Sequence, residues 1–92
     1  MKVDGVYKFK GIYHCGKVEL PKSIQQILES LEYDKVFVEV EHVYTHFKRY
    51  RIIIDIPEDS LMENLTELRR YVPEVKIYFA PVLSLVFEML SI

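Results

Sequence analysis

The sequence predicts an α+β fold in which an antiparallel sheet carries two amphipathic helices, in the order β-α-β-β-α-β. Apolar and polar residues alternate, as they do in half-buried strands, over residues 6–13, 34–43, 49–56 and 75–79. Two segments between these place apolar residues at helical spacing. The chain has 92 residues, half of them apolar and 28% charged, which is typical of one globular domain spanning residues 1–92. The order of elements is that of a ferredoxin-like two-layer sandwich, with both helices on one face of the sheet.

The first strand and the first helix are predicted from the first third of the chain. Along residues 6–13 the aromatic side chains share one face and the lysines the other, with Tyr7, Phe9 and Tyr13 opposed to Lys8 and Lys10. Gly16 then permits a turn, and residues 17–20 can form a short second strand. Pro21 is favoured in the first turn of a helix, so we expect a helix there with the apolar stripe Ile24, Ile27, Leu28 and Leu31.

The two central strands are predicted to form a hairpin. If the valines of residues 36–40 and the isoleucines of residues 52–56 face one core, the residue numbers of each cross-strand pair must add up to an even number. A three-residue loop at residues 44–46 satisfies this condition. It places Glu41 opposite Arg49 and Glu39 opposite Arg51, and each such pair stabilises the sheet by roughly 0.2–1 kcal/mol.

A second helix and a last strand are predicted from the remaining chain. Ser60 with Glu63 forms a capping box ahead of the apolar stripe Leu61, Leu65, Leu68 and Val72. Pro73 ends this helix, and a strand follows at residues 75–79. In the tail, residues 82–92, eight of eleven residues are apolar. Two alternatives account for this: part of the tail is covered by another subunit, or the tail completes the core.

Charge and hydropathy limit the classes of partner. Twelve basic residues against fourteen acidic residues give a net charge of −2, so nucleic-acid binding requires a local basic patch. The longest nearly uninterrupted apolar run, residues 80–87, is too short to cross a bilayer, and the first ten residues lack the apolar stretch of a signal peptide. We therefore expect a cytoplasmic protein without a membrane partner.

No motif indicates catalysis or a cofactor. Cys15 is the only cysteine, which excludes an intrachain disulfide and a cysteine-rich zinc site. His42 and His46 are four residues apart, but nothing in the sequence brings His14 or Cys15 beside them, so no metal site is expected. Adjacent residues on a strand point to opposite faces, which argues against a reactive pair of His14 and Cys15. The three glycines match no nucleotide-binding fingerprint, and we expect neither an enzyme nor a bound cofactor.

The best local basic patch is the segment YTHFKRYR at residues 44–51, which interleaves aromatic and basic side chains. This combination stacks on bases and neutralises phosphates, so Lys48, Arg49 and Arg51 are candidate nucleic-acid contacts. The predicted hairpin register offers the alternative that Arg49 and Arg51 are neutralised by glutamates on the same sheet face.

One stretch of the chain resembles a known family. The run GKVELPKSI, residues 16–24, is similar to the signature of AbrB-type swapped-hairpin proteins, and the spacing from Pro21 to Leu28 and to Asp34 also fits. The resemblance extends over about residues 1–41. It implies an intertwined homodimer that acts as a DNA-binding transcription regulator or antitoxin, with Lys8, Lys17 and Lys22 contacting phosphates.

The leading expectation is therefore a non-enzymatic, self-associating binding protein, and most specifically a small DNA-binding regulator. The alternative is a ferredoxin-like interaction module that assembles with itself or with a partner protein through residues 82–92. The expected partners are a second copy of the chain, DNA, or a protein that binds the apolar tail. The chain path distinguishes the two interpretations, because a swapped hairpin leaves one chain unable to close its own core.

Overall fold

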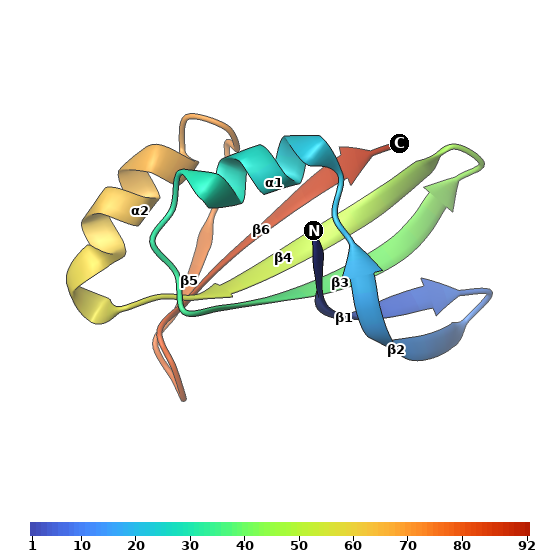
Figure 1. Ribbon diagram of the computed structural model, residues 1–92, viewed down its shortest axis with the longest axis horizontal. Helices are drawn as coiled ribbons and strands as arrows, with labels where there is room; N and C mark the ends of the chain where they lie inside the picture. Colours follow the sequence, from blue (N-terminus) through green and yellow to red (C-terminus); the bar gives the residue numbers. More distant parts are fainter.

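A computed structural model describes all residues from Met1 to Ile92 (Figure 1). The chain begins with a hairpin of two long strands, β1 (Lys2–Phe9) and β2 (Ile12–Glu19). Lys10 and Gly11 form its two-residue turn with φ values of 50° and 78°, the positive values that tight hairpin turns require. The predicted turn at Gly16 is wrong, because Gly16 lies inside β2 opposite Gly5 and Gly11 supplies the turn instead.

The first predicted helix is confirmed as α1 (Lys22–Glu29), whose buried residues are Ile24, Ile27 and Leu28. Pro21 occupies the N-cap position, and its carbonyl oxygen accepts hydrogen bonds from the backbone N–H groups of Ile24 and Gln25. The Gln25 side chain donates to the Leu20 carbonyl at 2.7 Å, which ties the helix to the end of β2.

The central hairpin consists of β3 (Lys35–Tyr44) and β4 (Phe47–Asp55). The predicted register is confirmed, since Glu41 pairs with Arg49 and Glu39 with Arg51. The predicted three-residue loop is wrong. The loop has two residues, and a β-bulge between His42 and Tyr44 adds one extra residue to β3. The pairs up to His42–Lys48 therefore keep the predicted register, although Tyr44 pairs with Phe47.

The second helix, α2 (Leu61–Leu68), follows a 3₁₀ turn, η1 (Glu58–Ser60). The predicted capping box is wrong because the Ser60 hydroxyl donates to the Pro57 carbonyl at 3.0 Å rather than capping α2. Asn64 in α2 is buried and ties α2 to the segment between α1 and β3. Its side chain accepts from the Glu32 N–H at 2.9 Å and donates to the Glu32 carbonyl at 2.7 Å.

The tail forms β6 (Ser84–Ser91), which inserts between β4 and the short strand β5 (Lys76–Tyr78). Leu85, Val86 and Phe87 are buried, so this part of the tail completes the core. Val82, Leu90 and Ile92 remain exposed.

The α+β class is confirmed as one mixed sheet of six strands, in the order β2-β1-β3-β4-β6-β5, with two helices. The ferredoxin-like order and the fully antiparallel sheet are wrong. An additional strand, β2, precedes α1 and forms a hairpin with β1, and β3 pairs with β1 in parallel. The observed order is β-β-α-β-β-α-β-β.

Both helices lie on one side of the sheet, and the strands extend beyond them toward the hairpin tips (Figure 1). The sheet therefore has a helix-covered side and an open side, which we call the outer face. On the helix side a single chain closes the core, with Val38, Ile52, Ile54, Leu85 and Phe87 at its centre. With eight residues each, α1 and α2 fall short of the length that a membrane-spanning helix needs.

Candidate nucleic-acid interface

The two sides of the sheet differ in charge. Side chains alternate between the sides along each strand, so the paired registers assign every strand residue to one side. All acidic strand residues belong to the outer face: Asp4, Glu19, Glu39, Glu41, Asp55 and Glu88. The helix side of the strands carries no carboxylate, and this is the side whose uncovered end is exposed near the hairpin tips.

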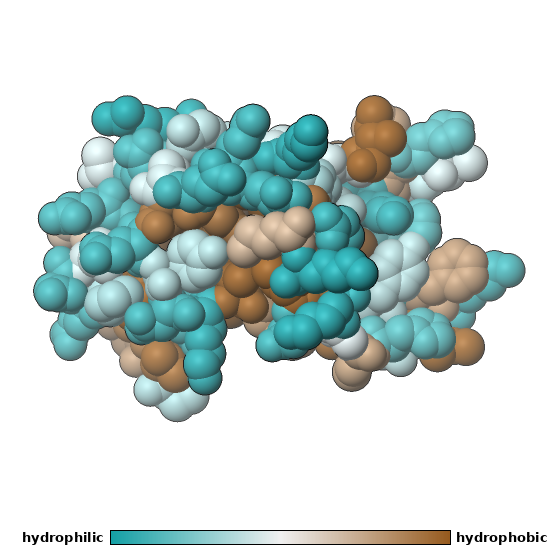
Figure 2. Space-filling view, in the orientation of Figure 1, coloured by the Kyte–Doolittle hydropathy of each residue, from teal (hydrophilic) through white to brown (hydrophobic).

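Three rings gather at this uncovered end, and we call Tyr7, Phe9 and His42 the aromatic cluster. The His42 ring meets Tyr7 and Phe9 edge-on, with centroid distances of 5.5 and 5.6 Å, and Tyr7 and Phe9 lie 6.4 Å apart. Tyr7 Oη and His42 Nδ1 are hydrogen-bonded at 2.6 Å, which fixes the two rings relative to each other. Phe9 is 44% exposed, so its ring is available to a ligand. Figure 2 shows tan and pale residues at the end of the molecule where the β1–β2 hairpin tip lies.

Two lysines border the aromatic cluster. Lys48 Nζ lies 5.6 Å from the centre of the Tyr7 ring, and Lys10 Nζ lies 5.3 Å from the centre of the Phe9 ring. Neither lysine forms an ion pair with a carboxylate. A cation over an exposed ring contributes only about 0.5–1 kcal/mol, so both ammonium groups can move to an external anion at little cost.

Tyr50 lies on the helix side of β4 and belongs to the core against which Tyr7 packs. Burial raises the pKa of its phenol above the usual 10.0, and the nearby Tyr7 raises it further. The Tyr50 phenol is therefore neutral at physiological pH.

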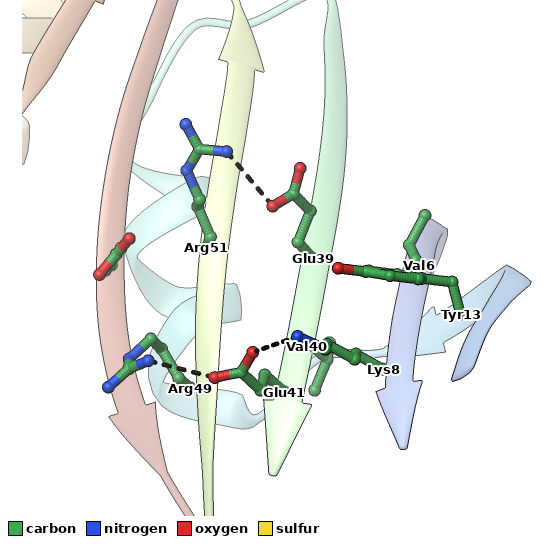
Figure 3. A pocket seen from close by; sticks show the side chains of 9 residues that line it. Val6, Lys8, Tyr13, Glu39, Val40, Glu41, Arg49 and Arg51 are labelled. Carbon is green, nitrogen blue, oxygen red and sulfur yellow. Dashed lines mark hydrogen bonds and ion pairs between the residues drawn. The ribbon is translucent and has the colours of Figure 1, made fainter. Parts of the chain in front are cut away.

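The outer face contains a shallow hollow of about 390 Å³ (Figure 3). Val6 lies at its apolar part, and Tyr13 lies over Val6 with its hydroxyl directed toward Glu39. Three basic and three acidic side chains line the hollow, namely Lys8, Arg49 and Arg51 with Glu39, Glu41 and Glu88. Their formal charges cancel, which makes this hollow a poor site for a phosphate chain.

The basic residues of the hollow are held by neighbouring glutamates. Glu41 accepts from Arg49 at 3.2 Å and lies 3.6 Å from Lys8 Nζ, and Glu39 accepts from Arg51 at 3.2 Å (Figure 3). These pairs are about half exposed, and surface pairs of this kind contribute about 0–1 kcal/mol each. They nevertheless lower the positive potential at the three basic groups.

The six basic residues singled out from the sequence do not form one group. Lys8, Arg49 and Arg51 line the hollow, and Lys17 lies on the same face in an ion pair with Asp4 at 2.7 Å. Lys22 is exposed at the start of α1. Lys48 alone belongs to the helix side, beside the aromatic cluster.

Sequence reasoning missed Phe9, Lys10 and His42 as members of one site. The alternation of Tyr7 and Phe9 with Lys8 and Lys10 was a usable signal. Tyr7 and Phe9 lie near His42 because β1 pairs with β3 in parallel, and no local sequence pattern predicts that pairing.

The candidate metal ligands are also dispersed. His14 and Cys15 lie on opposite sides of β2, with Cys15 exposed on the outer face. No three side chains of His, Cys, Asp or Glu come close enough to hold a metal ion.

No known protein-family model, curated protein or solved structure matches this chain.

Proposed function

We propose that this is a non-enzymatic nucleic-acid-binding protein that holds single strands on the aromatic cluster. The observation that carries the proposal is the combination of exposed rings with two unpaired lysines on a sheet surface free of carboxylates. Sheet surfaces that bind single strands use aromatic rings to stack bases and basic side chains to neutralise phosphates.

The expected contribution of the rings follows from their exposure. Phe9 presents the more exposed ring, and Tyr7 is half-buried with its hydroxyl held by His42. Stacking on one aromatic side chain contributes about 1–3 kcal/mol per base, which corresponds to roughly 5- to 150-fold in affinity. The contribution does not depend on sequence, so the proposed binding is tolerant of base identity.

Lys10 and Lys48 supply the proposed phosphate contacts. Each phosphate neutralised in a single strand contributes about −0.7 to the slope of log affinity against log salt concentration. Two such contacts predict a slope of about −1.4, which is modest and agrees with a chain whose net charge is −2.

The duplex-binding regulator implied by the resemblance to AbrB-type proteins is a second form of this proposal. It is supported by Lys22, which is exposed and takes part in no ion pair at the start of α1. Lys8 and Lys17 would have to exchange their carboxylate partners for phosphates. The swapped-hairpin dimer stays a prediction, although a single chain closes its own core. The interaction module at the tail, residues 82–92, also stays a prediction, and its exposed residues are Val82, Leu90 and Ile92.

Fluorescence anisotropy of labelled oligonucleotides tests the proposal. Single-stranded DNA, single-stranded RNA and the matching DNA duplex are titrated with protein between about 50 and 200 mM salt. We expect single strands to bind more tightly than the duplex. Phe9→Ala should weaken binding about 5- to 150-fold, and Lys48→Ala should reduce the salt slope by about 0.7.

Matched controls come from the far edge of the sheet. Phe79 and Lys76 are exposed near β5 and take part in no ion pair or aromatic contact. Phe79→Ala and Lys76→Ala should leave affinity and salt slope unchanged. Absence of single-strand binding at about 50 mM salt, or equal losses for Phe9→Ala and Phe79→Ala, contradicts the proposal. Tighter duplex binding that depends on Lys22 favours the regulator form instead.

A further inference from the structure

Strand β2 leaves a full row of backbone groups without a partner. It forms one margin of the sheet and pairs only with β1, in a register that runs without a break from Lys2–Glu19 to Phe9–Ile12 (Figure 1). The Leu20 N–H donates to the Met1 carbonyl at 3.0 Å, so even-numbered residues of this segment bond to β1. The N–H and C=O groups of the odd-numbered residues therefore point away from the sheet: Tyr13, Cys15, Lys17 and Glu19.

This edge lacks the usual protection against pairing. Proteins shield edge strands by keeping them short or by adding prolines, bulges and charged side chains, above all lysines. Lys17 is the one lysine of β2, and its charge is paired with Asp4 at 2.7 Å. The opposite edge strand, β5, has three residues, with Pro73 before it and Pro81 after it. By contrast, β2 has eight residues with no proline and no bulge, and all of them except Val18 are exposed.

We propose that two copies of the chain pair through β2 in antiparallel orientation, which joins their sheets into one. An antiparallel edge is complementary to a second copy of itself, because a two-fold rotation brings each outward N–H to an outward C=O. The helix sides of the two copies fall on the same side of the joined sheet only if the residue numbers of each pair add up to an even number. The inference does not rest on the proposed nucleic-acid function.

The side chains favour the register in which Cys15 faces the partner's Cys15. This register places Ile12 opposite the partner's Val18 on the helix side, so two apolar side chains cover each other. On the outer face it places Lys17 opposite the partner's Tyr13, which is a cation-aromatic pair. Centring the pairing on Lys17 would instead bring two ammonium groups together, and like charges directly opposite destabilise a sheet. Both aromatic clusters lie on the same side of the joined sheet.

Sedimentation velocity under reducing conditions tests the dimer with a matched pair of variants. The unaltered chain and Cys15→Ser are expected to sediment as dimers. Cys15→Lys places two like charges across the two-fold axis and should shift the protein to monomer. Cys15 is exposed, so both variants should keep the far-UV circular dichroism of the unaltered chain. At dilutions where all three proteins are monomeric they should also share one thermal midpoint. A protein that stays monomeric at about 1 mM, or a Cys15→Lys variant as dimeric as Cys15→Ser, overturns the inference.

Oxidation by diamide tests the register. Residues opposed in a bonded antiparallel pair have Cα atoms about 5.5 Å apart, which is within the range that a disulfide spans. Cys15 should therefore form an interchain disulfide rapidly at low protein concentration. The control is Cys15→Ser/Lys17→Cys, whose thiols would lie about 13 Å apart along the paired strands and should cross-link only slowly. Equal rates for the two proteins, or a faster control, overturn the register.

Discussion

The buried side chain of Asn64 predicts a large loss of stability from one small substitution. Its amide makes two hydrogen bonds with the backbone of Glu32, at 2.9 and 2.7 Å, and these bonds fix the segment between α1 and β3 against α2. A third contact, 3.3 Å long, joins its Nδ2 to the Ser60 hydroxyl. Each bond to the backbone contributes about 0.5–1.5 kcal/mol. Asn64→Ala should therefore lower the free energy of unfolding by about 2 kcal/mol, which corresponds to roughly 8–16 °C in Tm for a chain of this size.

Urea unfolding followed by circular dichroism measures this loss, and Thr66 provides the control. Thr66 lies two residues further along α2, is exposed, and donates its own hydrogen bond to the Met62 carbonyl at 2.9 Å. Because solvent can replace that bond, Thr66→Ala should change the free energy of unfolding by no more than about 0.5 kcal/mol. Equal effects of the two substitutions would refute the assignment of Asn64 as the link between α2 and the rest of the fold.

Four further substitutions test the fold. Gly5→Ala should destabilise the protein by about 1–3 kcal/mol, because an added Cβ would collide with the backbone of β3 and lie 2.9 Å from Val18 Cγ2; unchanged urea unfolding would contradict the close β1–β3 pairing. Leu85→Ala should cost about 2–5 kcal/mol and Leu90→Ala less than about 0.5 kcal/mol, since these residues of β6 are 0% and 56% exposed; similar midpoints for both would contradict the placement of β6. Burial, with Tyr7 adding to it, raises the pKa of Tyr50 above 10.0, so the folded state holds this proton more tightly than the unfolded chain. Stability should be full below about pH 10 and fall as the pH rises through the folded-state pKa, and Tyr50→Phe should remove this component in thermal melts at increasing pH.

Local periodicity was sufficient for the elements that have one buried side. The stripe of Ile24, Ile27 and Leu28 predicted α1, and the alternation along β3 and β4 predicted both strands and the pairing of Glu41 with Arg49. In these elements, burial of one face and exposure of the other produce a pattern that the sequence carries directly.

The sequence predicted only a short strand at residues 17–20 in place of β2, because almost all of β2 is exposed on both sides. Without a buried face there is no selection for alternation, and Gly16 in its middle suggested a turn. The parallel pairing of β1 with β3 also escaped prediction, since it depends on two segments about thirty residues apart. The tail was ambiguous for the opposite reason: Val86 is buried on the outer face while Leu85 and Phe87 are buried on the helix side, so no alternation was visible.

The sequence predicted the residue types of the candidate site but not which residues form it. The segment of residues 44–51 drew attention to mixed aromatic and basic side chains, yet its strand alternates, so Lys48 lies on the helix side while Arg49 and Arg51 lie on the outer face with glutamates. The partner rings of Lys48 come from β1. The cross-strand neighbours of a basic residue determine whether its charge is free to bind a phosphate. Which residues become neighbours depends on the strand order of the sheet, which local sequence does not show.

Nuclear magnetic resonance of the aromatic side chains during titration with single-stranded DNA tests the central claim most directly. Tyr13 is the internal reference, because it is 64% exposed but lies on the outer face. Our account predicts that the ring signals of Tyr7 and Phe9 shift with added DNA while those of Tyr13 stay in place. Shifts at Tyr13 with none at Tyr7 and Phe9 would contradict it and assign the binding to the outer face instead.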